Sequence, residues 1–180
     1  MNYIKYILLF LIVSEVCSSQ TIRFNNTYTG DLPGLRNIEI VDDGYIGLGF
    51  NYYSGKIQIF ILKIDTFGDT LWTKHYGDTI YNYYHGERNS LIKNYDGGYS
   101  LAGSRHDATN NACLLVKFDN NFDTLWTKLF FNNPDFTTFY NHVQTSDSGY
   151  ACIGYTNEFD PDGDILLVKT DAMGNMQWYK

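Results

Sequence analysis

The chain has 180 residues and a formal net charge of −7, and its acidic residues are dispersed rather than clustered. This balance argues against a nucleic-acid partner, because no basic stripe is present to neutralise phosphates, and it argues against docking on anionic lipid. Aromatic residues make up 17% of the chain, a content typical of pleated β surfaces on which rings pack across strands.

Residues 1–19 are predicted to be a secretory signal peptide, because Lys5 precedes an apolar run at residues 6–13 and small residues follow it. The run is shorter than the roughly 20 apolar residues that span a bilayer, and no second run follows. The alternative is a lipoprotein signal acylated at Cys17, which the two preceding residues fit poorly. The sequence therefore predicts secretion or a cell-surface location, with no membrane span.

A repeated motif organises the rest of the chain. DTLWTK at 69–74 recurs at 123–128, and NMQWYK at 175–180 is a degraded third copy. The tryptophans of these motifs lie 54 and 52 residues apart, at Trp72, Trp126 and Trp178. A period near 50 residues indicates a solenoid, a propeller or another repeat array.

The repeat boundaries follow from this period. Residues 35–88 form repeat 1, residues 89–140 form repeat 2, and residues 141–180 form repeat 3, which is incomplete. Residues 20–34 contain an N-terminal strand that resembles the last strand of a repeat, with Phe24 in the place of tryptophan.

Each repeat is predicted to contain four short strands. In repeat 2 these are NSLIKNY (89–95), GYSLAGS (98–104), ACLLVKF (112–118) and TLWTKLFF (124–131). The third is almost entirely apolar, which indicates a strand buried on both faces. No segment of 12 or more residues outside the leader has helical periodicity. We therefore expect an all-β fold, a partial β-propeller-like array of about three four-stranded antiparallel blades.

The motifs DGGYSLAG (96–103), Leu-Val-Lys (115–117) and DTLWTK resemble the repeats of exported propeller-like proteins of Bacteroidetes-type bacteria. Those proteins often carry a C-terminal sorting domain for type IX secretion, which this sequence lacks. The resemblance implies the fold and export, and it says little about activity.

Three repeats are fewer than the four to eight blades of a closed propeller. Either the chain is part of a longer protein, or it is an open array with exposed edges. Open edges favour aggregation, so we favour the first interpretation and expect further blades or chains to cover these edges.

Most repeated polar positions have a structural interpretation. Asp65, Asp119 and Asp171 begin predicted turns, so they are interpreted as turn residues rather than a carboxylate ring. The lysines before these turns are expected to be solvated or paired with Asp, and the tryptophans to pack between blades rather than stack on sugars. These lysines are Lys63, Lys117 and Lys169.

Cys113 and Cys152 lie in apolar stretches and are predicted to be buried, unpaired thiols, with a mutual disulfide as the alternative. Asp160, Asp162 and Asp164 alternate around a glycine, as in calcium-binding loops, but the distal glutamate of such a loop is missing. A polar hairpin is the favoured interpretation of this segment, and calcium is a weak alternative. No other cofactor and no catalytic motif are predicted.

The sequence favours an exported, non-catalytic repeat module for binding or adhesion at or outside the cell surface. Its ligand surface is expected where the repeats differ, in the loops at 51–56, 105–111 and 156–164. An extracellular glycan or protein is the expected ligand, and the candidate contact residues are Tyr52, Tyr53, His106, Asn110 and Phe159.

Two alternatives remain open. One is a propeller-fold hydrolase or lyase acting on extracellular carbohydrate, which the lack of an unrepeated polar cluster in the sequence disfavours. The other is a display scaffold for a missing C-terminal domain.

Overall fold

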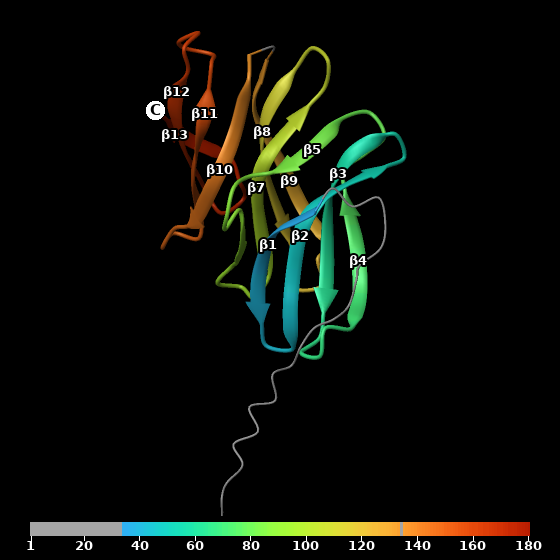
Figure 1. Cartoon of the computed structure of the whole chain (residues 1–180). Coiled ribbons are helices and arrows are strands. Elements are labelled where there is room, and N and C mark those ends of the chain that lie inside the picture. The colour runs from blue at the N-terminus through green and yellow to red at the C-terminus, as the bar shows by residue number, and fades with distance from the viewer. Residues whose placement is uncertain (1–33, 134) are drawn as a thin grey trace, which may run out of the picture.

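The computed structural model describes residues 34–133 and 135–180. These residues form 13 strands in three antiparallel sheets and contain no helix, so the predicted all-β fold is confirmed. The sheets stand side by side in chain order, and none of them closes on itself (Figure 1). The predicted signal peptide, Cys17 and the N-terminal strand with Phe24 lie outside the described residues.

Sheet A holds its four strands in chain order, each paired with the next. They are β1 (Gly34–Val41), β2 (Gly44–Tyr53), β3 (Lys56–Ile64) and β4 (Thr70–Tyr76). The β2–β3 turn has positive φ at Ser54 and Gly55, as required by the two-residue hairpin turns that match the twist of paired strands.

Sheet B has five strands, because its first strand is interrupted. It contains β5 (Asn82–His85), β6 (Leu91–Lys93), β7 (Tyr99–His106), β8 (Asn111–Phe118) and β9 (Thr124–Asn133). Both β5 and β6 pair with β7, one after the other. The sequence pattern predicted only the second of these two short strands.

Sheet C again has four strands in chain order. They are β10 (Thr137–Gln144), β11 (Tyr150–Thr156), β12 (Asp164–Thr170) and β13 (Met176–Tyr179). The described part of the chain contains no helix with the length and hydrophobicity needed to cross a membrane.

Two hydrophobic cores lie between neighbouring sheets. The first joins sheets A and B, with Ile59 and Leu48 facing Leu101 and Val116. The second joins sheets B and C, with Leu115 facing Val168 and other residues of sheet C. Strand β8 contributes alternate side chains to both cores, so the prediction that it is buried on both faces is confirmed.

Two of the three repeated tryptophans, Trp72 and Trp126, pack between sheets as predicted. Trp72 is half-buried against the first core, and its ring lies 5.4 Å from the ring of Phe122 in the next sheet. Trp126 is half-buried against the second core and packs near Gly174, where a Cβ would lie 2.9 Å from its ring. Trp178, the third copy, remains 46% exposed.

Gly-Tyr pairs recur in the three repeats, beginning at Gly44, Gly98 and Gly149, and the close approach of strands explains their glycines. A Cβ on Gly44 would collide with the carbonyl oxygen of Ile64, and one on Gly149 with that of Thr170. Only glycine leaves room for this contact. These glycines therefore recur because strand packing requires them, and not because they bind a ligand.

The repeated charges hold turns together. Asp65 accepts hydrogen bonds from the backbone N–H of Phe67 and of Asp69, at 2.8 and 2.9 Å, and its two counterparts do the same. Each lysine forms an ion pair with an aspartate in the turn between the first two strands of its sheet: Lys63 with Asp43, Lys117 with Asp96, and Lys169 with Asp147. The interpretation of the aspartates as turn residues and of the lysines as partners of Asp is therefore supported.

Candidate ligand-binding site

One pocket is built from residues that the repeats do not share. It lies where sheets A, B and C meet, has a volume of about 480 Å³, and is called here the junction pocket. This volume is within the range of roughly 300–1,000 Å³ that is usual for small-molecule sites. Its lining residues are Arg36, Phe50, Tyr84, His85, Gly86, Glu87, Ser104, His106, Phe136, Thr138 and Tyr140.

The pocket is formed by irregularities at the same place in the first strand of each sheet. The register shifts between Leu35 and Asn37 in sheet A and between Phe139 and Asn141 in sheet C, so Arg36 and Tyr140 are single bulge residues. In sheet B residues 86–90 separate β5 from β6 and lie opposite a single residue of β7, Ala102, so the equivalent bulge has four extra residues. Bulges re-aim side chains and are frequent beside functional sites.

Hydrogen bonds from both neighbours hold this central bulge in place. Asn37 donates to the carbonyl oxygen of Glu87 at 3.1 Å and accepts from the N–H of Asn89 at 3.2 Å. From the other side, Asn141 donates to the carbonyl oxygen of Arg88 at 3.2 Å. The two asparagines occupy equivalent positions in sheets A and C, so the bulge is clamped symmetrically.

Gly86 is required at the start of the bulge, because a Cβ there would collide with the backbone of Tyr140. Its N–H bonds to the carbonyl oxygen of Ala102 at 2.8 Å, and the N–H of Glu87 bonds to that of Tyr140 at 2.8 Å. The segment is thereby tied to sheets B and C at once.

Aromatic rings line the pocket in a continuous row. Phe50 stacks on His85 with ring centroids 4.2 Å apart and planes at 9°. Tyr84 then meets His106 edge to face at 5.2 Å, and His106 meets Phe136 at 5.5 Å. The row crosses all three sheets, so a flat ligand ring placed here would contact apolar faces on several sides.

The polar chemistry of the pocket centres on His85. Its Nδ1 lies 2.6 Å from the carbonyl oxygen of Gly86, which can only accept, so Nδ1 carries the proton. In the neutral ring Nε2 is then an acceptor, and this buried atom has no hydrogen-bond partner among residues 34–133 and 135–180. Burial lowers the pKa of His85, and the hydrogen bond to Gly86 offsets part of this effect.

His106 presents a second buried nitrogen to the pocket. Its buried Nε2 likewise has no partner in the described part of the chain, and burial lowers the pKa of His106. A buried polar atom is stabilised when it is hydrogen-bonded. Ligand groups that donate hydrogen bonds, such as hydroxyls, would pair with these two nitrogens.

The residues predicted from the loops are not brought together around this pocket. Of the five, only His106 lines it. Tyr52 and Tyr53 are 62% and 52% exposed at the end of β2, and Phe159 stacks on Tyr179 at 5.8 Å. Asn110 belongs to the β7–β8 turn, in which Asp107 accepts from its N–H at 2.6 Å.

Among residues 34–133 and 135–180, no group of three or more His, Cys, Asp or Glu side chains is placed to hold a metal ion. Asp160 accepts a hydrogen bond from the N–H of Asp162 at 2.9 Å, so it serves the turn of the β11–β12 loop. Asp164 lies at the start of β12 and is exposed.

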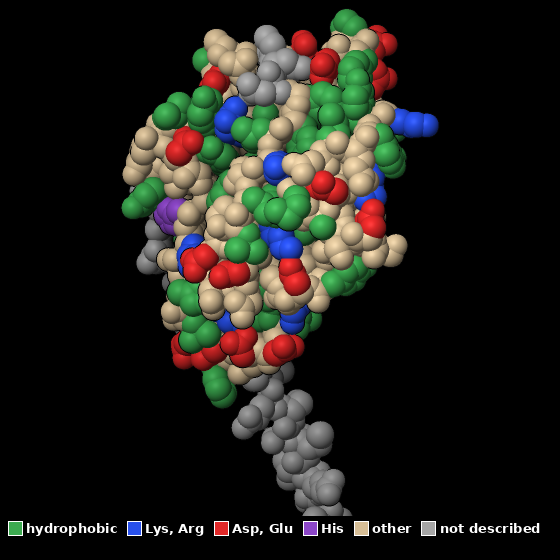
Figure 2. All heavy atoms as spheres, turned by 180° about the vertical axis from the view of Figure 1, so that it is seen from behind, with side chains coloured by type: hydrophobic (Ala, Val, Ile, Leu, Met, Phe, Trp, Pro, Cys, Tyr) green, Lys and Arg blue, Asp and Glu red, His purple; other side chains and the backbone are tan. Residues whose placement is uncertain are grey.

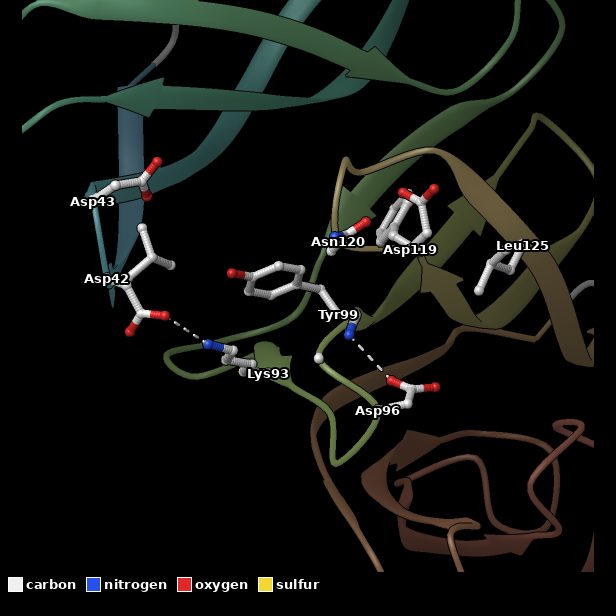
Figure 3. A pocket seen from close by; sticks show the side chains of 12 residues that line it. Asp42, Asp43, Lys93, Asp96, Tyr99, Asp119, Asn120 and Leu125 are labelled. Carbon is white, nitrogen blue, oxygen red and sulfur yellow. Dashed lines mark hydrogen bonds and ion pairs between the residues drawn. The ribbon is translucent and has the colours of Figure 1, made fainter.

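A second pocket, of about 670 Å³, opens at the opposite, turn-bearing end of sheets A and B (Figure 3). Tyr99 points into it between Asp42 and Asn120, and Asp42 pairs with Lys93 at 3.7 Å. The other acidic side chains have structural partners. Asp43 and Asp96 form ion pairs with lysines, and Asp119 accepts a hydrogen bond within its turn. These are the repeated contacts of the fold, which makes this pocket a weaker candidate.

Cys113 and Cys152 are free thiols buried in the second core, so their predicted unpaired state is confirmed. Cys113 contacts the hydroxyl of Thr137 at 3.1 Å, and burial raises the pKa of its thiol to about 12. Neither thiol borders the junction pocket.

Comparisons with known proteins add no assignment. No protein-family model matches this chain, and no curated protein matches it significantly.

Proposed function

We propose that the protein is an exported, non-catalytic repeat module that binds a hydroxylated ligand, a glycan, at or outside the cell surface. The observation that carries this proposal is the junction pocket, in which a row of aromatic rings surrounds buried histidine acceptors. Sugar rings combine apolar C–H faces with hydroxyl donors, and this combination suits such a lining. Export rests on the predicted leader and on the family resemblance.

The proposal includes the finer architecture. The three sheets are blades of a β-propeller-like array, and the junction pocket lies on the side where their first strands converge. Support comes from the common strand order of the sheets and from the face-to-face cores between them. The loops at 51–56, 105–111 and 156–164 extend the binding surface around a ligand held in the pocket.

The test is a glycan array followed by calorimetry on the purified chain. We expect one or more glycans to bind, and His85→Ala to weaken binding at least about tenfold, because a buried hydrogen bond to a ligand is worth roughly 1.5 kcal/mol. His75→Ala is the matched control, since His75 also has a buried unpartnered nitrogen but lies outside the pocket.

A second variant guards against misfolding. Tyr140→Ala removes a ring that is 39% exposed at the pocket rim and should weaken binding without changing the melting temperature. Replacement of the three loops by Asn-Gly tests the wider surface. Unchanged affinity in both pocket variants, with affinity lost in the loop variant, would move the site to the loops.

One observation favours the enzyme alternative. The sequence shows no unrepeated polar cluster, whereas the structure brings Arg36, His85, Glu87 and His106 to one pocket. A hydrolase or lyase would use Glu87 and a neutral histidine as the proton-transfer pair. Mass spectrometry of polysaccharides incubated with wild type and with Glu87→Gln separates the two functions, since binding alone leaves chain length unchanged.

A further inference from the structure

The strand bulges around the junction pocket carry three different chemical groups. Sheet A contributes Arg36, sheet B contributes Glu87 and sheet C contributes Tyr140, which are a cation, an anion and an aromatic ring. A bulge residue has no opposite partner in its ladder, so its side chain is released from the alternation that fixes the rest of the strand. The bulges thus give each repeat a different group at one common cavity.

The side chain of Arg36 lies on the pocket side of its strand. Its guanidinium carbon is 5.5 Å from the centroid of the Phe50 ring, which also lines the pocket. This contact uses none of the hydrogen-bond donors of the guanidinium. Because Arg36 is exposed, a ligand in the pocket can reach these donors.

Arg36 lacks the polar partners that most other basic side chains have. Four lysines form ion pairs with aspartates, namely Lys63, Lys93, Lys117 and Lys169. Lys74 and Lys128 reach turns of the next sheet, with Nζ 2.6 Å from Oδ1 of Asp123 and 2.9 Å from Oδ1 of Asn175, respectively. Among residues 34–133 and 135–180, Arg36 has only its contact with Phe50, and it is the one Lys or Arg residue that lines the junction pocket.

The remaining surface offers no general attraction for anions. The formal net charge of the chain is −7, and on the face seen in Figure 2 basic side chains lie singly among acidic ones. A polyanion would therefore be repelled over much of the surface. Recognition of an anionic group has to be local, by a side chain whose charge is not already neutralised, and Arg36 meets this condition.

We propose that the junction pocket takes an acidic sugar, whose anionic group pairs with Arg36; this inference rests on the proposed glycan-binding function. A ligand that fills the pocket displaces water from the guanidinium, so it has to supply acceptors in place of that water. The planar fork of arginine donors matches a carboxylate or a similar oxyanion with two parallel hydrogen bonds. A glycan with single acidic sugars among neutral ones fits the charge of this chain better than a polyanion.

Glu87 sets the orientation of this sugar. Burial raises the pKa of Tyr140, and the carboxylate of Glu87 raises this pKa further, so Glu87 lies near the Tyr140 ring. An anionic group is repelled at this side of the pocket, whereas a hydroxyl can donate to the carboxylate. The sugar therefore places its anionic group toward Arg36 in sheet A and its hydroxyls toward Glu87 in sheet B.

The experiment measures the binding of matched ligands to the purified chain by calorimetry. The probes are sialyllactose and glucuronate-branched xylo-oligosaccharides, each before and after reduction of the carboxylate to an alcohol, and lactose with and without a sulfate ester. We expect the acidic member of at least one pair to bind at least about tenfold more tightly than its neutral counterpart, because hydrogen bonds between charged groups are the stronger ones. The pair that shows this preference distinguishes a carboxylate from a sulfate.

Two arginine variants localise the preference. Arg36→Gln should lower the affinity for the acidic member to that of its neutral counterpart and leave the affinity for the neutral member unchanged. Arg88→Gln is the matched control, because it removes the same charge from an exposed residue of the central bulge that does not line the pocket. This control should keep the preference. Equal loss of the preference in both variants would show that net charge governs it, and would overturn the inference.

The outcomes separate this inference from the function on which it rests. Equal binding of the acidic and neutral members overturns the acidic-sugar inference and leaves glycan binding in place. Binding of none of these probes and of no glycan on the array overturns the proposed function, and the inference with it. The affinity of Arg36→Gln for the neutral members reports whether the pocket of this variant is intact.

Discussion

At the scale of single residues, burial lowers the pKa values of several histidines, and His142 is the most deeply buried of these. His142 is 2% exposed, and its Nε2 lies 2.7 Å from the hydroxyl of Ser100. Ser100 donates its own proton to Asn94 at 2.9 Å, so the histidine must be the donor in this pair. Its buried Nδ1 has no partner among the described residues, and burial lowers the pKa of His142 to about 3.

This histidine should make stability depend on acidity. Because the pKa of His142 is lower in the folded state than its usual 6.5, the unfolded chain binds more protons between those values. Stability is therefore full above pH 6.5 and falls as the pH drops toward 3. The contribution lost by pH 5 is about 2 kcal/mol.

Urea unfolding at pH 7, 6 and 5 measures this loss. His142→Gln should reduce the loss of unfolding free energy between pH 7 and pH 5 by about 2 kcal/mol. Part of the pH dependence should remain, because the pKa values of His75, His85 and His106 are also lowered. Identical slopes in wild type and variant would show that His142 does not stay neutral in the fold.

Residue-scale sequence reasoning succeeded where a position recurs. Asp65 and its counterparts were predicted to be turn residues and the repeated lysines to be solvated or paired with Asp, and the structure confirms both. Sequence reasoning could not find His85, because this residue does not recur in the other repeats. It could not find Asn37, because this side chain acts through a hydrogen bond to the backbone of a different sheet.

At the scale of the strand and the sheet, the fold was predictable because alternation, turns and period agree. The interrupted first strand of sheet B was not predicted, although the spacing contains a signal for it. The Gly-Tyr pairs are 98 − 44 = 54 and 149 − 98 = 51 residues apart. The three additional residues correspond to the longer bulge that builds the junction pocket.

The repeated tryptophans give a matched experiment within one chain. Trp72→Ala removes a ring packed between sheets A and B and should destabilise the chain by roughly 3 kcal/mol. Trp178→Ala acts on the equivalent but exposed ring and should cost less than about 1 kcal/mol. Urea titration measures both variants, and equal losses would show that Trp178 is packed in solution.

At the scale of the whole molecule, the three sheets do not share protection equally. Sheet B has a core on each face, whereas sheet C has a described core on one face only. Strands β7 and β8 are buried over most of their length. Local opening is least favourable where both faces are packed.

Hydrogen exchange should therefore rank the sheets. We expect the amides of β7 and β8 to exchange slowest and those of β12 and β13 to exchange orders of magnitude faster, because their free energy of opening is lower. Exchange measured by mass spectrometry on peptic fragments resolves these strands. Uniform protection across sheets B and C would contradict this ranking.

The lysine that ends each DTLWTK motif also gives the molecule a direction. Lys74 and Lys128 each stabilise a turn about 50 residues further along the chain, never one in their own sheet. A substitution in one repeat is consequently compensated or aggravated in the following repeat, so paired changes between successive repeats should accumulate together. Gene duplication in phase with this period inserts a sheet whose two faces already match their new neighbours, and the array can lengthen one unit at a time without redesign.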